Sequence, residues 1–183
     1  MIDDSKIVEI QNSIESNVSY FTNITDRIVL ENTIELDSIL NQINTNIIQV
    51  DNPPVDVIEK YFLQLTNHLY FMQERVERLS IYDSISKINY KEVYNRNYLN
   101  PVLEKPKPSV SDITSYAENA TIYEQSMSEM YNKAYKIVRS KVEAAQLMVQ
   151  TLSKVLSKRM NDTQLSNRDN PFYMSNNGRI LNE

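Results

Sequence analysis

The stretch from Ile58 to Leu79, IEKYFLQLTNHLYFMQERVERL, decides the fold of this chain of 183 residues. Its apolar residues recur at alternating intervals of three and four, and this spacing places them on one stripe of an α-helix. A stripe that stays apolar over three heptads needs a partner helix to cover it. The members of this seam are Ile58, Phe62, Leu65, Leu69, Met72, Val76 and Leu79.

Glycine is almost absent from the chain, since Gly178 is the single one. Residues 55–100 and 109–170 contain neither glycine nor proline. Because β-hairpins and phosphate-binding loops depend on glycine, the composition argues against a nucleotide-binding α/β enzyme. We therefore expect an all-α protein of long antiparallel helices that form a helical bundle or coiled coil and assemble into oligomers. A monomeric bundle is the alternative, because the helices can also cover one another within one chain.

Turn formers and seams divide the chain into five segments. Two capping signals, Ser109-x-x-Asp112 and Thr121-x-x-Glu124, mark expected helix starts. The segments are an acidic helical part (1–52) with a short helix over 5–20 and a seam from Val29 to Val50, a long helix with a tyrosine- and lysine-rich end (53–100), a proline-rich linker (101–108), a short helix plus a long basic helix (109–165), and a flexible tail (166–183).

Several features point to a cytoplasmic protein that does not enter a membrane. No apolar run approaches the eighteen or so residues of a membrane span, and the N-terminal stretch MIDDSKIVEI lacks the basic and apolar parts of a signal peptide. The chain has no cysteine, which excludes disulfides and thiolate metal sites.

Residues suited to catalysis are sparse. His68 is the only histidine, and its place beside Leu69 predicts a helix-surface position. Glu74-x-x-Glu77 resembles half of the magnesium site of all-helical nucleotide pyrophosphatases, but no glutamate in the chain is followed three residues later by aspartate. We therefore expect no enzyme activity, no metal and no cofactor.

Charge is distributed unevenly along the chain, although the net charge is only -5. Residues 1–60 hold eleven acidic and three basic side chains, whereas residues 130–168 hold eight basic and two acidic ones. The long C-terminal helix is thus basic. The cations predicted to contact nucleic acid there are Lys133, Lys136, Arg139, Lys154, Lys158 and Arg159.

A second basic stretch carries tyrosines at four-residue spacing, so that the rings share one helix face. Aromatic rings among cations suit single-stranded nucleic acid, because bases stack on the rings while the cations follow the phosphates. The residues of this stretch are Lys87, Tyr90, Lys91, Tyr94, Arg96 and Tyr98. Two other interpretations stay open: the tyrosines can form a packing face, and the basic helix can lie against the acidic N-terminal segment.

The arrangement resembles the UvsY-like recombination mediators of tailed phages. Residues 61–99, YFLQLTNHLYFMQERVERLSIYDSISKINYKEVYNRNYL, and residues 109–165, from SVSDITSYAENATIYEQ to SKRMNDTQL, carry the likeness. Members of this family have a Lys-Ala-Arg-Leu-type element for DNA contact on the first long helix. In Val76-Glu77-Arg78-Leu79 only Arg78 and Leu79 correspond, and the glutamate replaces a cation, which moves the expected contact toward the two basic clusters.

The resemblance implies a non-enzymatic protein that forms homo-oligomers and binds single-stranded DNA in the phage-infected host cell. It implies two further partners, a recombinase that the protein helps to load and a single-strand-binding protein that covers the strand. The alternative is a helical phage structural or assembly protein, such as a virion or scaffold component, which the heptads and the acidic total charge favour.

Overall fold

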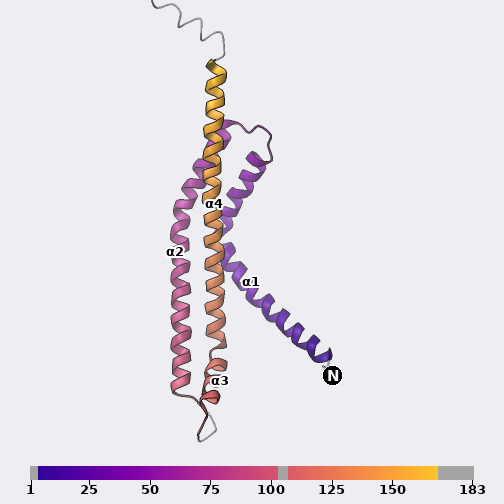
Figure 1. Ribbon diagram of the computed structural model, residues 1–183, viewed down its shortest axis with the longest axis vertical. Helices are drawn as coiled ribbons and strands as arrows, with labels where there is room; N and C mark the ends of the chain where they lie inside the picture. Colours follow the sequence, from indigo (N-terminus) through magenta and orange to yellow (C-terminus); the bar gives the residue numbers. More distant parts are fainter. Residues whose placement is uncertain (1–3, 103–106, 169–183) are drawn as a thin grey trace, which may run out of the picture. The chain divides into compact units, whose positions relative to one another are not determined.

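The computed structural model of the protein describes residues 4–102 and 107–168. These residues form four α-helices and one π-helical turn, and no strand occurs among them, which confirms the predicted all-α class. The helices are α1 (Asp4–Ile43), the π-helix η1 (Asn44–Ile48), α2 (Val55–Leu99), α3 (Val110–Ala120) and α4 (Ile122–Arg168) (Figure 1).

Helix α1 is longer than the sequence pattern predicted. It is one helix of 40 residues, so the separate short helix expected over 5–20 is wrong. The reason is that residues 20–29 contain no glycine or proline to end a helix. Phe21, Ile24 and Ile28 also keep the apolar spacing of three and four up to the residue before Val29, where the predicted seam begins.

The connection from α1 to α2 is short and held by side chains. The Gln49 amide donates to the Asn44 carbonyl at 3.0 Å, a five-residue step that closes the π-helical turn. Asn46 donates to the hydroxyl group of Tyr61 at 2.8 Å and so ties this turn to α2. Pro53 and Pro54 then precede the first residue of α2, Val55, in agreement with the proline-marked start that the sequence predicted.

The two capping signals differ in their outcome. Ser109 forms the predicted capping box, since its hydroxyl accepts from the Asp112 amide at 3.2 Å and its own amide donates to the Asp112 carboxylate at 3.0 Å. Thr121 instead donates backward to the carbonyl of Ala117 at 2.8 Å, where the sequence pattern predicted a forward contact with α4. Helix α4 nevertheless begins next to it, at Ile122, as expected.

At its other end α4 continues to Arg168, so residues 166–168, predicted to belong to a flexible tail, are helical. The rest of that tail, 169–183, and residues 103–106 of the predicted linker lie outside the described residues.

The chain separates into two compact units, and each unit takes residues from two stretches. Unit 1 consists of Met1–Ile34 and Met72–Lys141, and unit 2 of Glu35–Phe71 and Val142–Glu183. Helices α1, α2 and α4 each contribute to both units, whereas α3 belongs to unit 1.

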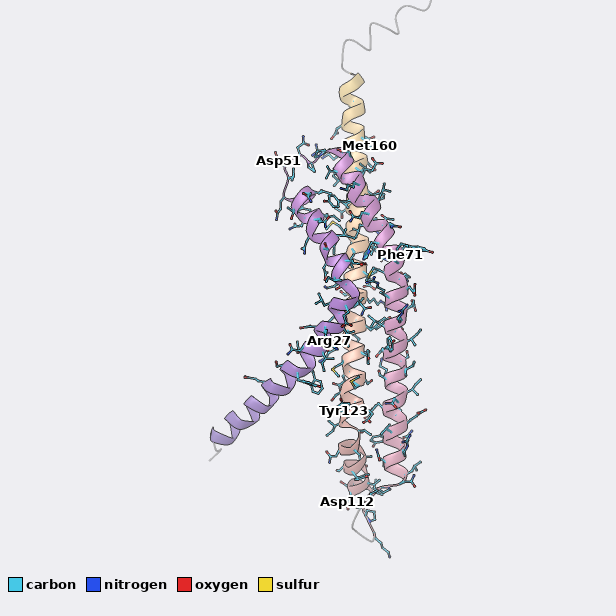
Figure 2. The ribbon with its side chains drawn as sticks, turned by 180° about the vertical axis from the view of Figure 1, so that it is seen from behind. Arg27, Asp51, Phe71, Asp112, Tyr123 and Met160 are labelled. Atoms are coloured by element: carbon cyan, nitrogen blue, oxygen red, sulfur yellow. The ribbon has the colours of Figure 1, made fainter. Side chains whose placement is uncertain are left out.

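In unit 1, α2 and α4 lie side by side (Figures 1 and 2). Tyr82 of α2 stacks on Tyr131 of α4 with ring centroids 5.5 Å apart. Helix α1 joins them through Arg75, which donates to the Asn32 carbonyl at 3.3 Å, and through Lys141, which donates to the buried Thr33 hydroxyl at 3.2 Å. The apolar core of the unit comprises Val29, Met72, Val76, Leu79, Ala117, Met130, Ala134 and Val138.

Unit 2 has its own apolar core, in which the predicted seam residues Ile58 and Leu65 of α2 are fully buried. Tyr61 is buried in place of Phe62, which is half-buried. His68 is half-buried like its seam neighbour Leu69, and only 14% of its side chain is exposed, so the predicted helix-surface position of this histidine is wrong. The core residues are Leu36, Ile39, Ile43, Ile47, Ile58, Tyr61, Leu65, Val142, Ala145 and Leu152.

Candidate nucleic-acid interface

The tyrosines at the end of α2 form a ladder of rings. Tyr90 and Tyr94 are tilted by 52° with centroids 6.2 Å apart, and Tyr94 and Tyr98 are stacked at 6.1 Å with an angle of 18°. Such contacts hold neighbouring rings in fixed orientations. The predicted tyrosine stripe is therefore a row of ring contacts on one face of α2 in unit 1.

The ladder continues the buried face of α2. Tyr90 follows the buried Asp83 by seven residues and the buried Val76 by fourteen, a spacing that returns to the same side of a helix. Tyr90 and Tyr94 are accordingly half-buried, and Tyr98 has 36% of its surface exposed. Of the three rings, that of Tyr98 is the most accessible to a base.

Two of the four predicted cations of α2 form ion pairs within the helix. Arg78 pairs with Glu74 at 2.7 Å, and Lys87 pairs with the buried Asp83 at the same distance. Lys91 and Arg96 have exposed side chains near the tyrosine ladder in sequence. To contact a phosphate, Arg78 would have to share or leave Glu74, and Lys87 would have to share or leave Asp83.

A first group of predicted cations on α4 also belongs to unit 1. Lys133, Lys136 and Arg139 are all exposed, and Arg139 donates to the hydroxyl of Tyr135 at 3.4 Å. Since Tyr82 stacks on Tyr131 in the same unit, the structure brings the cations of α2 and this group of α4 into one compact body.

The second group on α4 belongs to unit 2. Lys154 and Lys158 are exposed, whereas Arg159 is half-buried. Arg159 lines an apolar groove of about 520 Å³ together with Ile47, Pro53, Leu147, Leu152 and others. The predicted site residues therefore fall into two sets, one in each unit.

One aromatic and basic pattern escaped the sequence analysis. Tyr131, Tyr135 and Arg139 follow one another at four-residue spacing on α4, the same spacing as in the α2 ladder. The signal that identifies the pattern is its interval of four combined with the neighbouring lysines. Both rings are half-buried.

One acidic side chain of α1 lies close to the first cation group. Asp26 of α1 and Lys133 of α4 line the same groove of about 260 Å³ in unit 1, with Glu129 beside them. An acidic helix near a basic one weakens the attraction of the basic helix for phosphate. The groove therefore brings Asp26, from the acidic part of the chain (1–60), close to Lys133, from the basic part (130–168).

No group of three or more histidine, cysteine, aspartate or glutamate side chains suited to a metal ion occurs among the described residues. His68 has 14% of its side chain exposed, and its Nδ1 lies 3.9 Å from a carboxylate oxygen of Glu35 in unit 2. None of the described helices has an apolar stretch that would reach across a lipid bilayer.

The chain was compared with protein-family models, with curated proteins and with solved structures. No family model, curated protein or solved structure matches it.

Proposed function

We propose that the protein binds single-stranded DNA without catalysing a reaction and acts as a recombination mediator in the phage-infected host cell. In this proposal it assembles from several copies, contacts a strand covered by a single-strand-binding protein and helps to load a recombinase. The observation that carries the proposal is the exposure of the α4 cations Lys133, Lys136, Arg139, Lys154 and Lys158.

The charge of α4 supports contact with a polyanion. Exposed lysine and arginine side chains in a segment with eight basic and two acidic residues attract phosphate by a long-range field. The tyrosine ladder supports a single strand over a duplex, because a base must be unpaired to stack on a side chain. Tyr98, with 36% exposure, is the ring best placed for such a contact.

A second candidate, a helical phage structural or assembly protein, is favoured by two specific observations. Tyr90 and Tyr94 are half-buried on the face that also carries core residues. Large apolar side chains such as Ile81 and Ile85 are exposed on α2, as in subunits that pack against other proteins. Under this candidate, α4 binds a protein partner and has no preference for DNA.

The test is a titration of labelled single-stranded DNA with the full chain at several salt concentrations, read by fluorescence anisotropy. Each phosphate contact should contribute roughly 0.7 to the slope of log affinity against log salt concentration. Two triple variants, Lys133→Gln with Lys136→Gln and Arg139→Gln, and Lys154→Gln with Lys158→Gln and Arg159→Gln, should weaken binding and flatten this slope.

The matched control removes the same charge elsewhere, by changing the exposed residues Arg27, Lys60 and Lys107 to glutamine. It should retain most of the affinity and the slope. If the protein shows no salt-dependent affinity for single-stranded DNA, or if the control loses as much as the α4 variants, the DNA-binding proposal is wrong and the structural candidate takes its place.

A further inference from the structure

Three isoleucines of α2 form an exposed stripe in unit 1. Ile81, Ile85 and Ile88 have 58%, 57% and 56% of their surface exposed. Each follows a buried core residue, respectively Met72, Val76 and Leu79, by nine residues. Nine residues are two and a half turns of a helix, so the stripe lies on the side of α2 opposite to the core.

The stripe has the spacing of a helix-pairing seam. The intervals from Ile81 to Ile85 and from Ile85 to Ile88 are four and three, which is one heptad. Isoleucine is not favoured on an exposed helix face, because it loses side-chain freedom there and gains no contact. Contiguous exposed apolar side chains are typical of surfaces that contact another molecule.

Charged residues continue the stripe at both ends. Glu74 and Arg78 precede it, and Glu92 and Arg96 follow it, again at intervals of three or four. All four side chains are exposed. The line therefore runs glutamate, arginine, three isoleucines, glutamate, arginine.

This order of charges distinguishes the two ways in which the stripe can pair with itself. When two copies run antiparallel about Ile85, Arg78 of one copy faces Glu92 of the other, and Glu74 faces Arg96. When they run parallel in register, each of these residues faces its own like-charged counterpart. Opposite charges across a helix pair set its orientation, so the stripe is self-complementary only in the antiparallel arrangement.

We propose that this stripe, Glu74 to Arg96 of α2, is the surface through which two copies of the chain pair antiparallel, with their two-fold axis near Ile85. A two-fold contact uses the same patch on both copies, which one stripe per chain satisfies. A standard interface uses about 20–30 residues on each side, whereas the stripe offers three isoleucines and four charged side chains per copy. The pairing is therefore weak and depends on concentration.

This inference specifies the self-association in the proposed function. It is tested without DNA, so its failure and the failure of DNA binding are distinguishable.

The first experiment measures the mass of the full chain by sedimentation over a range of concentrations. The chain should shift from its monomer mass of 21.4 kDa toward larger species as concentration rises. Changing Ile81, Ile85 and Ile88 to glutamine should raise the dissociation constant at least tenfold. The matched control changes Leu30, Ile34 and Ile122 to glutamine. These residues lie outside the stripe and are 53%, 56% and 57% exposed, so the control should leave the dissociation constant unchanged. A monomer at every concentration, or an equal loss in the control, overturns the proposal.

The second experiment tests the orientation and uses the fact that the chain has no cysteine. Arg78→Cys and Glu92→Cys proteins are prepared separately, mixed, and treated with a short bis-maleimide. Antiparallel pairing predicts that the mixture gives a crosslinked dimer with one chain of each variant, while each protein alone crosslinks poorly. Equally efficient crosslinking of Arg78→Cys with itself indicates a parallel pair and overturns the proposed arrangement.

Discussion

Asn132 of α4 donates a hydrogen bond of 3.1 Å to the buried carboxylate of Asp83 on α2. The other carboxylate oxygen accepts from Lys87 at 2.7 Å. A polar pair inside an apolar helix interface favours the one register in which both groups find a partner. This contact therefore fixes how α2 and α4 of unit 1 align, one helical turn after the last seam residue, Leu79.

The first prediction concerns this pair. Asn132→Ala should lower the free energy of unfolding by about 1 to 3 kcal/mol, because it leaves a buried carboxylate oxygen without its donor. Combined with Asp83→Ala it should show a coupling of roughly 0.5 to 3 kcal/mol in a double-mutant cycle. Urea denaturation followed by circular dichroism measures both values. Asn89→Ala, at an exposed position of α2, serves as the control. If the effects of Asn132→Ala and Asp83→Ala simply add, the two residues are not coupled.

The second prediction uses two leucines of α2 that differ in burial. Leu65 is fully buried in the core of unit 2, whereas Leu63 is 57% exposed. Leu65→Ala should cost about 2 to 5 kcal/mol, because it removes packed methyl groups and leaves a cavity. Leu63→Ala should change the stability by about 0.5 kcal/mol or less. Equal costs in urea denaturation would mean that the buried face of α2 lies elsewhere.

Much of the fold could be predicted because local signals agree with the packing. The long helix α2 follows from its unbroken seam and the prolines before it, and the capping box at Ser109 follows from its spacing. The half-buried position of His68 could not be predicted, because a helix of 3.6 residues per turn drifts from a heptad seam and the partner helices decide which side is covered. The backward hydrogen bond of Thr121 likewise depends on α3 ending directly before α4.

The candidate site could be predicted only as a list of residues. Sequence shows that the cations of α4 cluster, but not that they fall into two units. It also does not show that Arg78 and Lys87 already hold carboxylate partners. The pairing of Tyr82 with Tyr131 joins residues that are far apart in the chain, and no local pattern encodes it.

The third prediction separates stacking from packing within the tyrosine ladder. Tyr98→Leu should weaken binding of single-stranded DNA by up to about 1 to 3 kcal/mol per stacked base, with little change in the salt slope or in stability. Tyr90→Leu, at a half-buried position, should instead lower the free energy of unfolding by about 1 kcal/mol. Anisotropy titration and urea denaturation measure the two effects. If only Tyr90→Leu has an effect, the ladder is a packing face.

The fourth prediction concerns the acidic start of α1. Removing the acidic N-terminal segment should raise the affinity for single-stranded DNA, because its carboxylates oppose the phosphates or compete with them for the α4 cations. The structure limits how much can be removed. Val29, Leu36 and Ile43 of α1 are core residues, so a deletion of residues 1–50 would remove part of both cores.

A deletion of residues 1–14 avoids these core residues and removes Asp3, Asp4 and Glu9 with a single lysine. Affinity should rise about twofold to fivefold at low salt, which corresponds to 1 kcal/mol or less for exposed charges, and the gain should vanish at high salt because of screening. The control keeps the full length and changes Asp3 and Asp4 to asparagine and Glu9 to glutamine. The same gain in this variant assigns the effect to charge. A gain in the deletion alone would mean that the segment obstructs the strand by its bulk, and no gain in either variant would mean that the acidic segment does not regulate binding.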